Sequence, residues 1–339
     1  MFTERVDMLA TPHGIDRYLE LIHPMLAIRE QRGIVTGVHR TTPDTITLRI
    51  RPSRAWRGFT AGQHVRVSVT VDGVRRTRCY SPASSQHARG FELTVKASGL
   101  VSSWLRENAR PGLVLDLSPA EGDFTLPATR PDKLLLISGG SGITPVMSML
   151  RTLTDEGHTG EVVFLHYATD EAHVPCLDTL RATGHRLVLA HTAAGSGHFT
   201  EAHLRAAAPW FAEATTYLCG PPGLMAGVTA VFDQLGIADR LRTEDFRPST
   251  PADPGAVGRI TFSRSGRTCD NTGRSLLEQA ESAGLRPEHG CRMGICLSCT
   301  RRKTAGTVRD LRSGELNDED DTEVQLCVSV PVGTVSIDL

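Results

Sequence analysis

Long apolar runs are missing from this sequence. The stretch Lys-Leu-Leu-Leu-Ile at 133–137 is far shorter than the roughly 18 apolar residues of a membrane span. The first ten residues include Glu4 and Asp7 and have no apolar core of the kind that secretory signals carry. We therefore expect a cytoplasmic protein without a transmembrane segment.

Aromatic residues and net charge are also scarce. Aromatics make up 5% of the 339 residues, and the formal net charge is -1. No basic run is interleaved with aromatics, so the sequence does not favour a nucleic-acid partner. A hydrophobic content of 40% with 22% charged residues is ordinary for globular protein. At roughly 100–200 residues per domain, we expect two or three domains.

Cysteine is too sparse for a disulfide scaffold, because only eight occur in the chain. Three of them nevertheless crowd together, and Cys291, Cys296, Cys299 and Cys327 form C-x4-C-x2-C with a distant fourth cysteine. This is the plant-type [2Fe–2S] spacing, in which four thiolates hold two irons. A zinc site or structural thiols are the alternatives, but zinc sites more often pair two C-x2-C knuckles and only one is present. We predict the cluster, and we expect Cys269, outside the pattern, to be a core thiol.

The chain begins with an expected helical extension at 1–31, interrupted at Pro24. Short alternating segments then predict an antiparallel β-barrel over 32–130, with strands at 33–39, 45–51, 64–71, 91–96 and 113–117 and a helix at 101–108.

From 131 to 246 the pattern changes to apolar strands alternating with helices, which predicts an α/β domain with a parallel sheet. Residues 247–257 are proline-rich and predict a linker. The region 258–339 predicts an α+β domain. We expect strands at 259–263, 325–330 and 333–338, and a helix at 275–283.

Two short motifs in the barrel region suit a flavin. Arg78, Tyr80 and Ser81 form R-x-Y-S, in which Arg78 and Tyr80 share one strand face. An arginine can neutralise a phosphate, a tyrosine can stack on a ring, and a serine can hydrogen-bond a ring edge. Gly99 and Ser102 precede an expected helix, whose N-terminal amides suit a pyrophosphate. Ser102 could also be the helix N-cap, a role compatible with pyrophosphate binding. A pyrophosphate site favours FAD, with FMN as the alternative.

Two further motifs suit a nicotinamide nucleotide. Gly139, Gly140, Gly142 and Thr144 lie in a turn between an apolar strand and a helix. Cys219, Gly220 and Pro221 follow another strand, and Phe246 closes the region. Asp170 and Glu171 would accept ribose hydroxyls and favour NADH, whereas Arg181 and Arg186 could reach the 2′-phosphate of NADPH.

These motifs resemble the ferredoxin–NADP reductase superfamily over about 33–339, joined to a plant-type, β-grasp ferredoxin domain. The resemblance implies that Ser81 orients the flavin N5 and that Cys219 lies beside the hydride-donating carbon. It also implies that Phe246 covers the flavin ring. Reductase components of bacterial oxygenases and acyl-CoA desaturases have this domain order. The stretch 11–19 resembles the desaturase group, whose members tend to use NADPH, although Thr169 stands where we would expect an arginine.

We therefore expect an electron-transfer reductase that uses NADPH or NADH, FAD and a [2Fe–2S] cluster. Its partner would be a membrane desaturase, with transient membrane-surface association through that partner, or an oxygenase of the Rieske, di-iron or P450 type. A non-enzymatic redox sensor is the alternative of another class. His64, His166 and His191 lie on or near expected strands, and we expect them to be structural.

Overall fold

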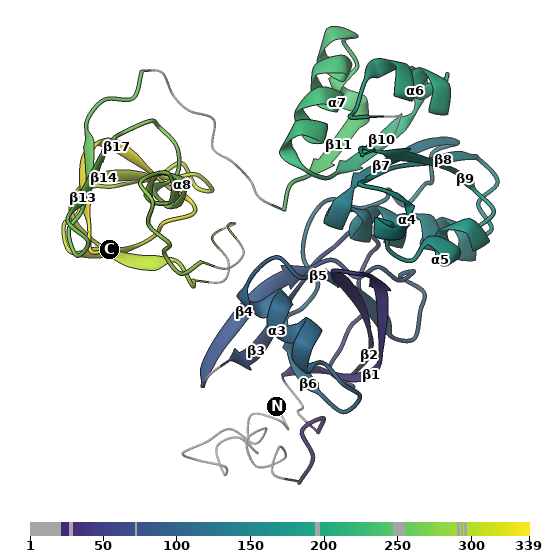
Figure 1. The fold of residues 1–339 in the computed structure, drawn as a ribbon, viewed down its shortest axis with the longest axis horizontal. Coiled ribbons are helices and arrows are strands. Elements are labelled where there is room, and N and C mark those ends of the chain that lie inside the picture. The colour runs from purple at the N-terminus through teal and green to yellow at the C-terminus, as the bar shows by residue number, and fades with distance from the viewer. Residues whose placement is uncertain are drawn as a thin grey trace. The chain divides into compact units, whose positions relative to one another are not determined.

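The computed structural model describes residues 22–26, 30–71, 73–193, 197–246, 255–289, 292, 294 and 297–339. The chain divides into two compact units, Met1–Arg75 with Cys79–Asp245, and Arg76–Arg78 with Phe246–Leu339 (Figure 1). The helices expected at 13–31 fall largely outside the described residues, as does most of the proposed linker. No helix of the described part is long and apolar enough to cross a membrane.

The barrel is a six-stranded antiparallel sheet in the order β4-β3-β6-β1-β2-β5. Alternating β-branched residues, as in Val65–Val71, bury one face of each strand around a valine- and leucine-rich core. Helix α3 contributes Val101 and Leu105 to that core. The bounds are β1 Gln31–Thr42, β2 Thr45–Pro52, β3 Val65–Val71, β4 Val74–Tyr80, β5 Phe91–Lys96, β6 Val114–Leu117 and α3 Leu100–Asn108.

The α/β part has a five-stranded parallel sheet in the order β11-β10-β7-β8-β9. Leu135 and Ile137 of β7 pack in one cluster with α6 and α7, and Figure 1 shows α4 and α5 on the other side. The bounds are β7 Lys133–Gly139, α4 Ile143–Asp155, β8 Glu161–Ala168, α5 Leu177–Ala182, β9 Arg186–His191, α6 Glu201–Ala207, β10 Thr215–Cys219, α7 Pro222–Gln234 and β11 Leu241–Glu244.

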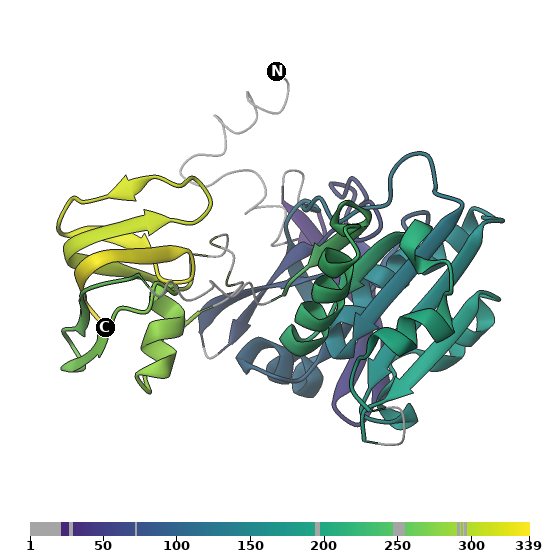
Figure 2. The same ribbon diagram turned by 90° about the horizontal axis from the view of Figure 1, so that it is seen from above.

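The C-terminal unit is a mixed sheet packed against one helix, as Figure 2 shows. Leu276, Leu277 and Ala280 of α8 pack with Val335 and Ile337 of β17. The bounds are β12 Arg259–Phe262, β13 Arg267–Asp270, α8 Leu276–Ser282, β14 Thr300–Asp310, β15 Leu316–Asn317, β16 Thr322–Gln325 and β17 Ser329–Ile337.

The expected strands of this unit need correction, although the α+β class is confirmed. The two strands expected at 325–330 and 333–338 are one strand, β17, preceded by the separate β16. Strands β13 and β14 were not expected at all. Strand β14 is rich in Arg, Lys and Thr, and its pairing with both β16 and β17 supplies the order that its polar sequence does not suggest.

Candidate cofactor sites

The two glycine-containing turns of the α/β part pack directly against each other. A Cβ on Gly142 would lie 2.3 Å from the carbonyl oxygen of Cys219. A Cβ on Gly139 would lie 2.8 Å from Pro221 Cδ, and one on Gly220 would lie 2.9 Å from Leu224 Cδ2. Only glycine permits this approach, so the predicted nicotinamide residues of the two turns form one surface at the carboxyl end of the parallel sheet.

A row of polar side chains crosses the sheet at the same end. Cys219 is in register with Glu244 on one side and with Ser138 on the other, and Ser138 is in register with His166. Residues directly opposite each other on paired strands share a face, and here it is the face away from α6 and α7. The Ser138 hydroxyl and His166 Nδ1 are 2.8 Å apart.

Burial and charge shift the acidity of this row. Burial raises the pKa of the Cys219 thiol well above its ordinary value, and the Glu244 and Asp245 carboxylates raise it further. Burial also raises the pKa of Glu244, while His64 opposes that rise. Burial lowers the pKa of His166 to about 3. The thiol and imidazole are therefore neutral at pH 7, and Cys219 is suited to contact a ring rather than to act as a nucleophile.

The predicted flavin serine lies where strand β4 has just ended. Ser81 is 3% exposed, and its hydroxyl has no hydrogen-bond partner within the described residues. Tyr80 packs partly against the barrel core, and Arg78 is half-buried, with Nη1 donating to the carbonyl of Thr77 at 2.8 Å. A buried hydroxyl without a partner is unfavourable by about 1–3 kcal/mol, so Ser81 fits a site completed by a polar ligand such as a flavin edge.

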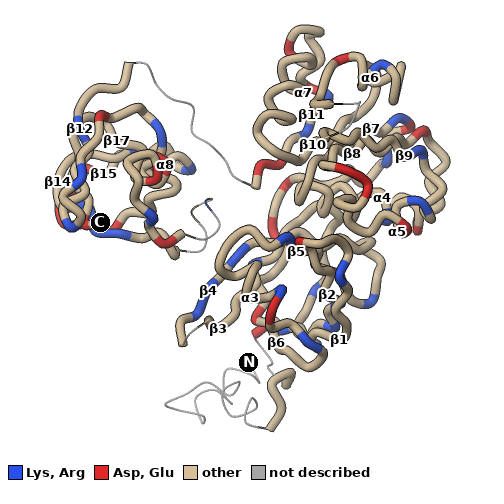
Figure 3. Tube along the Cα trace, in the orientation of Figure 1, with Lys and Arg blue, Asp and Glu red and all other residues tan. Residues whose placement is uncertain are grey.

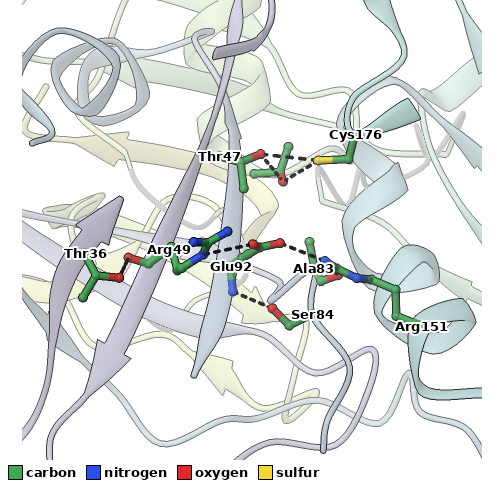
Figure 4. A network of polar contacts seen from close by, with 9 residues as sticks. Thr36, Thr47, Arg49, Ala83, Ser84, Glu92, Arg151 and Cys176 are labelled. Atoms are coloured by element: carbon green, nitrogen blue, oxygen red, sulfur yellow. Dashed lines mark hydrogen bonds and ion pairs between the residues drawn. The ribbon is translucent and has the colours of Figure 1, made fainter. Parts of the chain in front are cut away.

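Helix α4 connects the flavin segment to the nucleotide turn. Arg151 Nη1 donates to the Ala83 carbonyl at 3.0 Å, and the Ser148 hydroxyl donates to the Ser84 carbonyl at 2.6 Å. Figure 4 shows Arg151 directed at Ala83 and Glu92. Because α4 begins directly after Gly142, these bonds fix the glycine turn relative to the segment after Ser81. None of the sequence motifs includes these positioning residues, because they lie in two separate stretches of the chain.

At the start of α3 the structure corrects one expectation. The N-cap is Gly99, and Ser102 is the third helical residue. The Ser102 hydroxyl accepts from the amides of Ser98 and Gly99, each at 3.0 Å, and donates to the Gly99 carbonyl. The hydroxyl is thus used by the capping box, while the first helical amides remain suited to a pyrophosphate.

A narrow cleft beside the nucleotide turn contains Lys96, a basic residue that none of the sequence motifs includes. It is lined by Gly140 and Ser141 of the turn and by Thr94 and Lys96 of the barrel. Lys96 Nζ lies 3.2 Å from Asp44 Oδ2. The only sequence signal was the position of Lys96 shortly before Gly99. Thr144, by contrast, is buried and donates to the Ser141 carbonyl at 3.3 Å, which supports the turn itself.

The residues expected at the adenine ribose are held by their neighbours. Asp170 Oδ1 accepts from the His173 amide at 3.2 Å and lies 2.7 Å from His173 Nδ1. Glu171 pairs with Arg181 at 2.7 Å, and Arg186 donates to the Ala206 carbonyl at 3.2 Å. These contacts engage the acids and both arginines alike, so they do not distinguish NADH from NADPH.

In the C-terminal unit, Cys299 and Cys327 are brought together by the backbone. The Leu326 amide donates to the Cys299 carbonyl at 3.2 Å, and the Gly294 amide donates to Cys327 Sγ at 3.2 Å. Both cysteines are buried. Two thiols with an amide aimed at one sulfur fit a thiolate-bound iron–sulfur cluster. Cys291 and Cys296 lie outside the described residues. Cys269 is half-buried against the core of the unit, as a structural thiol would be.

Residues 315–323, which follow β14, include six acids, and two of them are engaged within the unit. Asp321 pairs with Arg302 at 2.8 Å, and Asp320 accepts from the Gly306 amide at 3.1 Å. Figure 3 shows basic and acidic segments interleaved along this unit.

Comparisons with known proteins agree with this arrangement. An oxidoreductase FAD-binding domain matches residues 33–126, an oxidoreductase NAD-binding domain matches 136–230, and a 2Fe-2S iron-sulfur cluster binding domain matches 260–332. An NADPH oxidoreductase of Mycobacterium tuberculosis is 39% identical, covering 98% of this chain and 90% of its own length.

A more distant relative and a solved structure also match most of the chain. The glycine betaine monooxygenase reductase subunit of Pseudomonas aeruginosa is 30% identical over 83% of this chain and 87% of its own length. The structure of phthalate dioxygenase reductase, 23% identical, covers 91% of this chain and 98% of its own length with a TM-score of 0.58, and it supports the fold.

The fold and the matched domains define an NAD(P)H-dependent electron-transfer oxidoreductase with FAD and [2Fe–2S] as cofactors. The chain belongs to the ferredoxin–NADP reductase superfamily, in the group with a C-terminal [2Fe–2S] domain.

Proposed function

We propose that this protein is the reductase component of a multi-protein system in the cytoplasm, and that it delivers single electrons to a partner desaturase or oxygenase. The carrying observation is that one chain joins the two packed nucleotide turns, and the flavin segment bonded to α4, to a unit in which Cys299 and Cys327 are adjacent. When bound, the flavin accepts electrons in pairs and the cluster carries them one at a time. We propose domain limits of 32–130, 131–246, 247–257 and 258–339.

The residue roles are part of this proposal. Arg78 holds the flavin phosphate, Tyr80 stacks on the ring, and Ser81 orients N5; the Gly99 turn and the first amides of α3, capped by Ser102, receive the pyrophosphate. The nucleotide surface is shaped by Gly139, Gly140, Gly142, Gly220 and Pro221. On this surface, Cys219 and Thr144 position the nicotinamide. Phe246, half-buried after β11, covers the flavin ring. The metal ligands are Cys291, Cys296, Cys299 and Cys327.

We propose NADPH as the preferred reductant. The M. tuberculosis relative carries NADPH in its name. The contacts of Asp170, Glu171 and Arg181 with their neighbours favour neither nucleotide, so this assignment rests on that name and on the resemblance of residues 11–19 to reductases that tend to use NADPH. A clear preference for NADH in a titration would overturn this assignment.

For the terminal acceptor we propose an acyl-CoA or fatty-acid desaturase in a membrane, with the reductase reaching the membrane surface through that partner. The support is the resemblance of residues 11–19 to that group of reductases. A soluble hydroxylase is the second candidate, because one relative serves a glycine betaine monooxygenase.

One experiment tests the function directly. The protein is purified anaerobically, its visible spectrum is recorded, and it is titrated separately with NADH and NADPH. We expect flavin and cluster absorption, and reduction by NADPH at the lower concentration. Cys296→Ser should remove the cluster while nucleotide-dependent flavin reduction survives. Colourless protein would contradict both a reductase and a redox sensor. Flavin and cluster absorption with negligible cytochrome c reduction by either nucleotide would favour the non-enzymatic redox sensor.

The acceptor is tested by reconstitution. The reduced protein is mixed with a desaturase in vesicles or with a purified hydroxylase, and cluster reoxidation is followed under single-turnover conditions. Faster reoxidation by the hydroxylase alone would overturn the desaturase assignment.

A further inference from the structure

One buried contact between a histidine and a glutamate joins the barrel to the α/β sheet; the glutamate, Glu244, stands two residues before Phe246, where related reductases carry an acid near the flavin, whereas the histidine, His64, belongs to none of the cofactor motifs. His64 Nδ1, at the start of β3, lies 3.7 Å from Glu244 Oε1, at the end of β11. The His64 side chain is 11% exposed and that of Glu244 is 14% exposed. The two side chains come from parts of the chain 180 positions apart, so only the tertiary structure brings them together.

The pair is poorly satisfied by the rest of the protein. Neither ring nitrogen of His64 has a hydrogen-bond partner among the residues that the structure describes, and the same holds for Glu244 Oε2. His64 as a whole residue is 8% exposed, so water does not readily replace those partners. Buried polar groups without partners are costly, and in native proteins they concentrate where a ligand or a reaction uses them.

The surroundings place this pair at the nucleotide surface. Glu244 is directly in register with Cys219, which packs against Gly142. Asp245 follows Glu244, and both carboxylates raise the pKa of Cys219. On the barrel side, His64 pairs through its backbone with Glu121, whose carboxylate is 3.1 Å from Arg66 Nη1. Among the described residues, Glu244 is the ionisable side chain that faces the imidazole directly; Asp245 and Cys219 adjoin Glu244, and Glu121 with Arg66 adjoins the His64 backbone.

We propose that His64 is a positioning residue for Glu244: it keeps that carboxylate charged and fixed beside Cys219, at the surface formed by the two glycine turns. Negative charge there stabilises the positive ring of an oxidised nicotinamide. The inference rests on the proposed function for the identity of that ligand. The expectation that His64 is merely structural is replaced by this role.

The physical basis is a balance of two effects on Glu244. Burial favours the protonated carboxyl group, whereas His64, by hydrogen bonding and charge, favours the carboxylate. Without His64, burial acts unopposed and Glu244 takes up its proton at higher pH. An opposite charge within about 4–6 Å lowers a carboxyl pKa by about 1–3. We therefore expect His64→Gln to raise the pKa of Glu244 further.

The test is an NMR titration of the holoprotein labelled with carbon-13 at the glutamate carboxyl, in the oxidised state and without an electron acceptor. The Glu244 signal is assigned by its loss in Glu244→Gln. The matched control is His87→Gln, because His87 also faces a glutamate across the same two domains, with Nε2 2.8 Å from Glu156 Oε1, but is half-exposed. We expect a higher pKa of Glu244 in His64→Gln and an unchanged pKa of Glu244 in the control.

A second measurement covers the case in which His64→Gln folds poorly. In the Glu244→Gln background, which carries no charge to position, adding His64→Gln should leave the rate and pH profile of flavin reduction by NADPH unchanged. In the wild-type background, His64→Gln should move the acid limb of the pH profile of flavin reduction to higher pH. An unchanged Glu244 titration, or equal rate losses in both backgrounds, would overturn the proposal. A protein that binds no flavin would instead contradict the proposed function.

Discussion

Arg151 of helix α4 and Glu92 of strand β5 form an ion pair between the α/β sheet and the barrel, with Nη1 and Oε2 2.9 Å apart. The same guanidinium nitrogen donates to the Ala83 carbonyl. Both side chains are less than a quarter exposed, at 24% and 19%. The pair therefore fixes the flavin segment to the helix that begins at the nucleotide turn.

Replacing this arginine should loosen the junction. Arg151→Gln leaves a partly buried carboxylate and a carbonyl with weaker partners, and we expect a loss of roughly 1–3 kcal/mol in unfolding free energy, measured in urea. Arg49→Gln is the control, because Arg49 lies 3.6 Å from the same Glu92 but is 60% exposed. It should change stability by at most about 1 kcal/mol. Equal losses in the two variants would show that burial of the pair is unimportant.

The packing of the two turns predicts a nucleotide-specific defect. In Gly142→Ala the new methyl group would meet the Cys219 carbonyl at 2.3 Å, so one turn must move. We expect FAD binding to persist and the rate of flavin reduction by NADPH to fall at least about tenfold, which corresponds to about 1.4 kcal/mol. Gly223→Ala, where a Cβ meets nothing within 4 Å, should react normally in stopped-flow experiments. A normal rate in Gly142→Ala would contradict the assignment.

Two buried serines should behave in opposite ways. The Ser81 hydroxyl has no partner in the described part of the chain, so Ser81→Ala should leave the stability of the flavin-free protein unchanged or slightly higher. We expect at least about a tenfold slower flavin reduction. The Ser148 hydroxyl donates to the Ser84 carbonyl at 2.6 Å, and Ser148→Ala should lose about 1 kcal/mol of stability instead. Thermal unfolding and stopped-flow absorbance separate the two effects.

The buried His166 predicts a pH dependence of stability. Its pKa falls from an ordinary 6.5 to about 3 on folding, because burial disfavours the imidazolium. The unfolded chain therefore binds a proton that the folded one does not between these values. Its contribution to stability is complete above pH 6.5 and is lost as the pH falls toward 3, by about 1.4 kcal/mol per pH unit.

Urea unfolding followed by circular dichroism across this pH range measures that slope. We expect His166→Asn to lower the slope of the unfolding free energy against pH by the amount that about one bound proton contributes. His39→Asn, at an exposed position, should leave that slope unchanged. If both variants keep the wild-type slope, His166 is not the group that titrates.

The elements that could be predicted are those with a strong local pattern. The apolar run at β7 and the Gly-rich turn after it define the α/β part, and the cysteine spacing defines the C-terminal domain. Strand β14 was missed because its Arg, Lys and Thr residues have no alternating apolar pattern, and its order comes from pairing on both sides. Ser102 was placed at the N-cap because helix starts are uncertain by one or two residues.

By itself the sequence determined the domain order, the cofactor classes and most of the motif residues, because glycine turns and thiolate spacings are local requirements of the ligands they hold. The tertiary structure decided which side chains support those motifs. Arg151 with Glu92, and His64 with Glu244, are far apart in the chain and meet only because two domains pack together. Long-range packing of this kind leaves no periodicity or spacing in a single sequence.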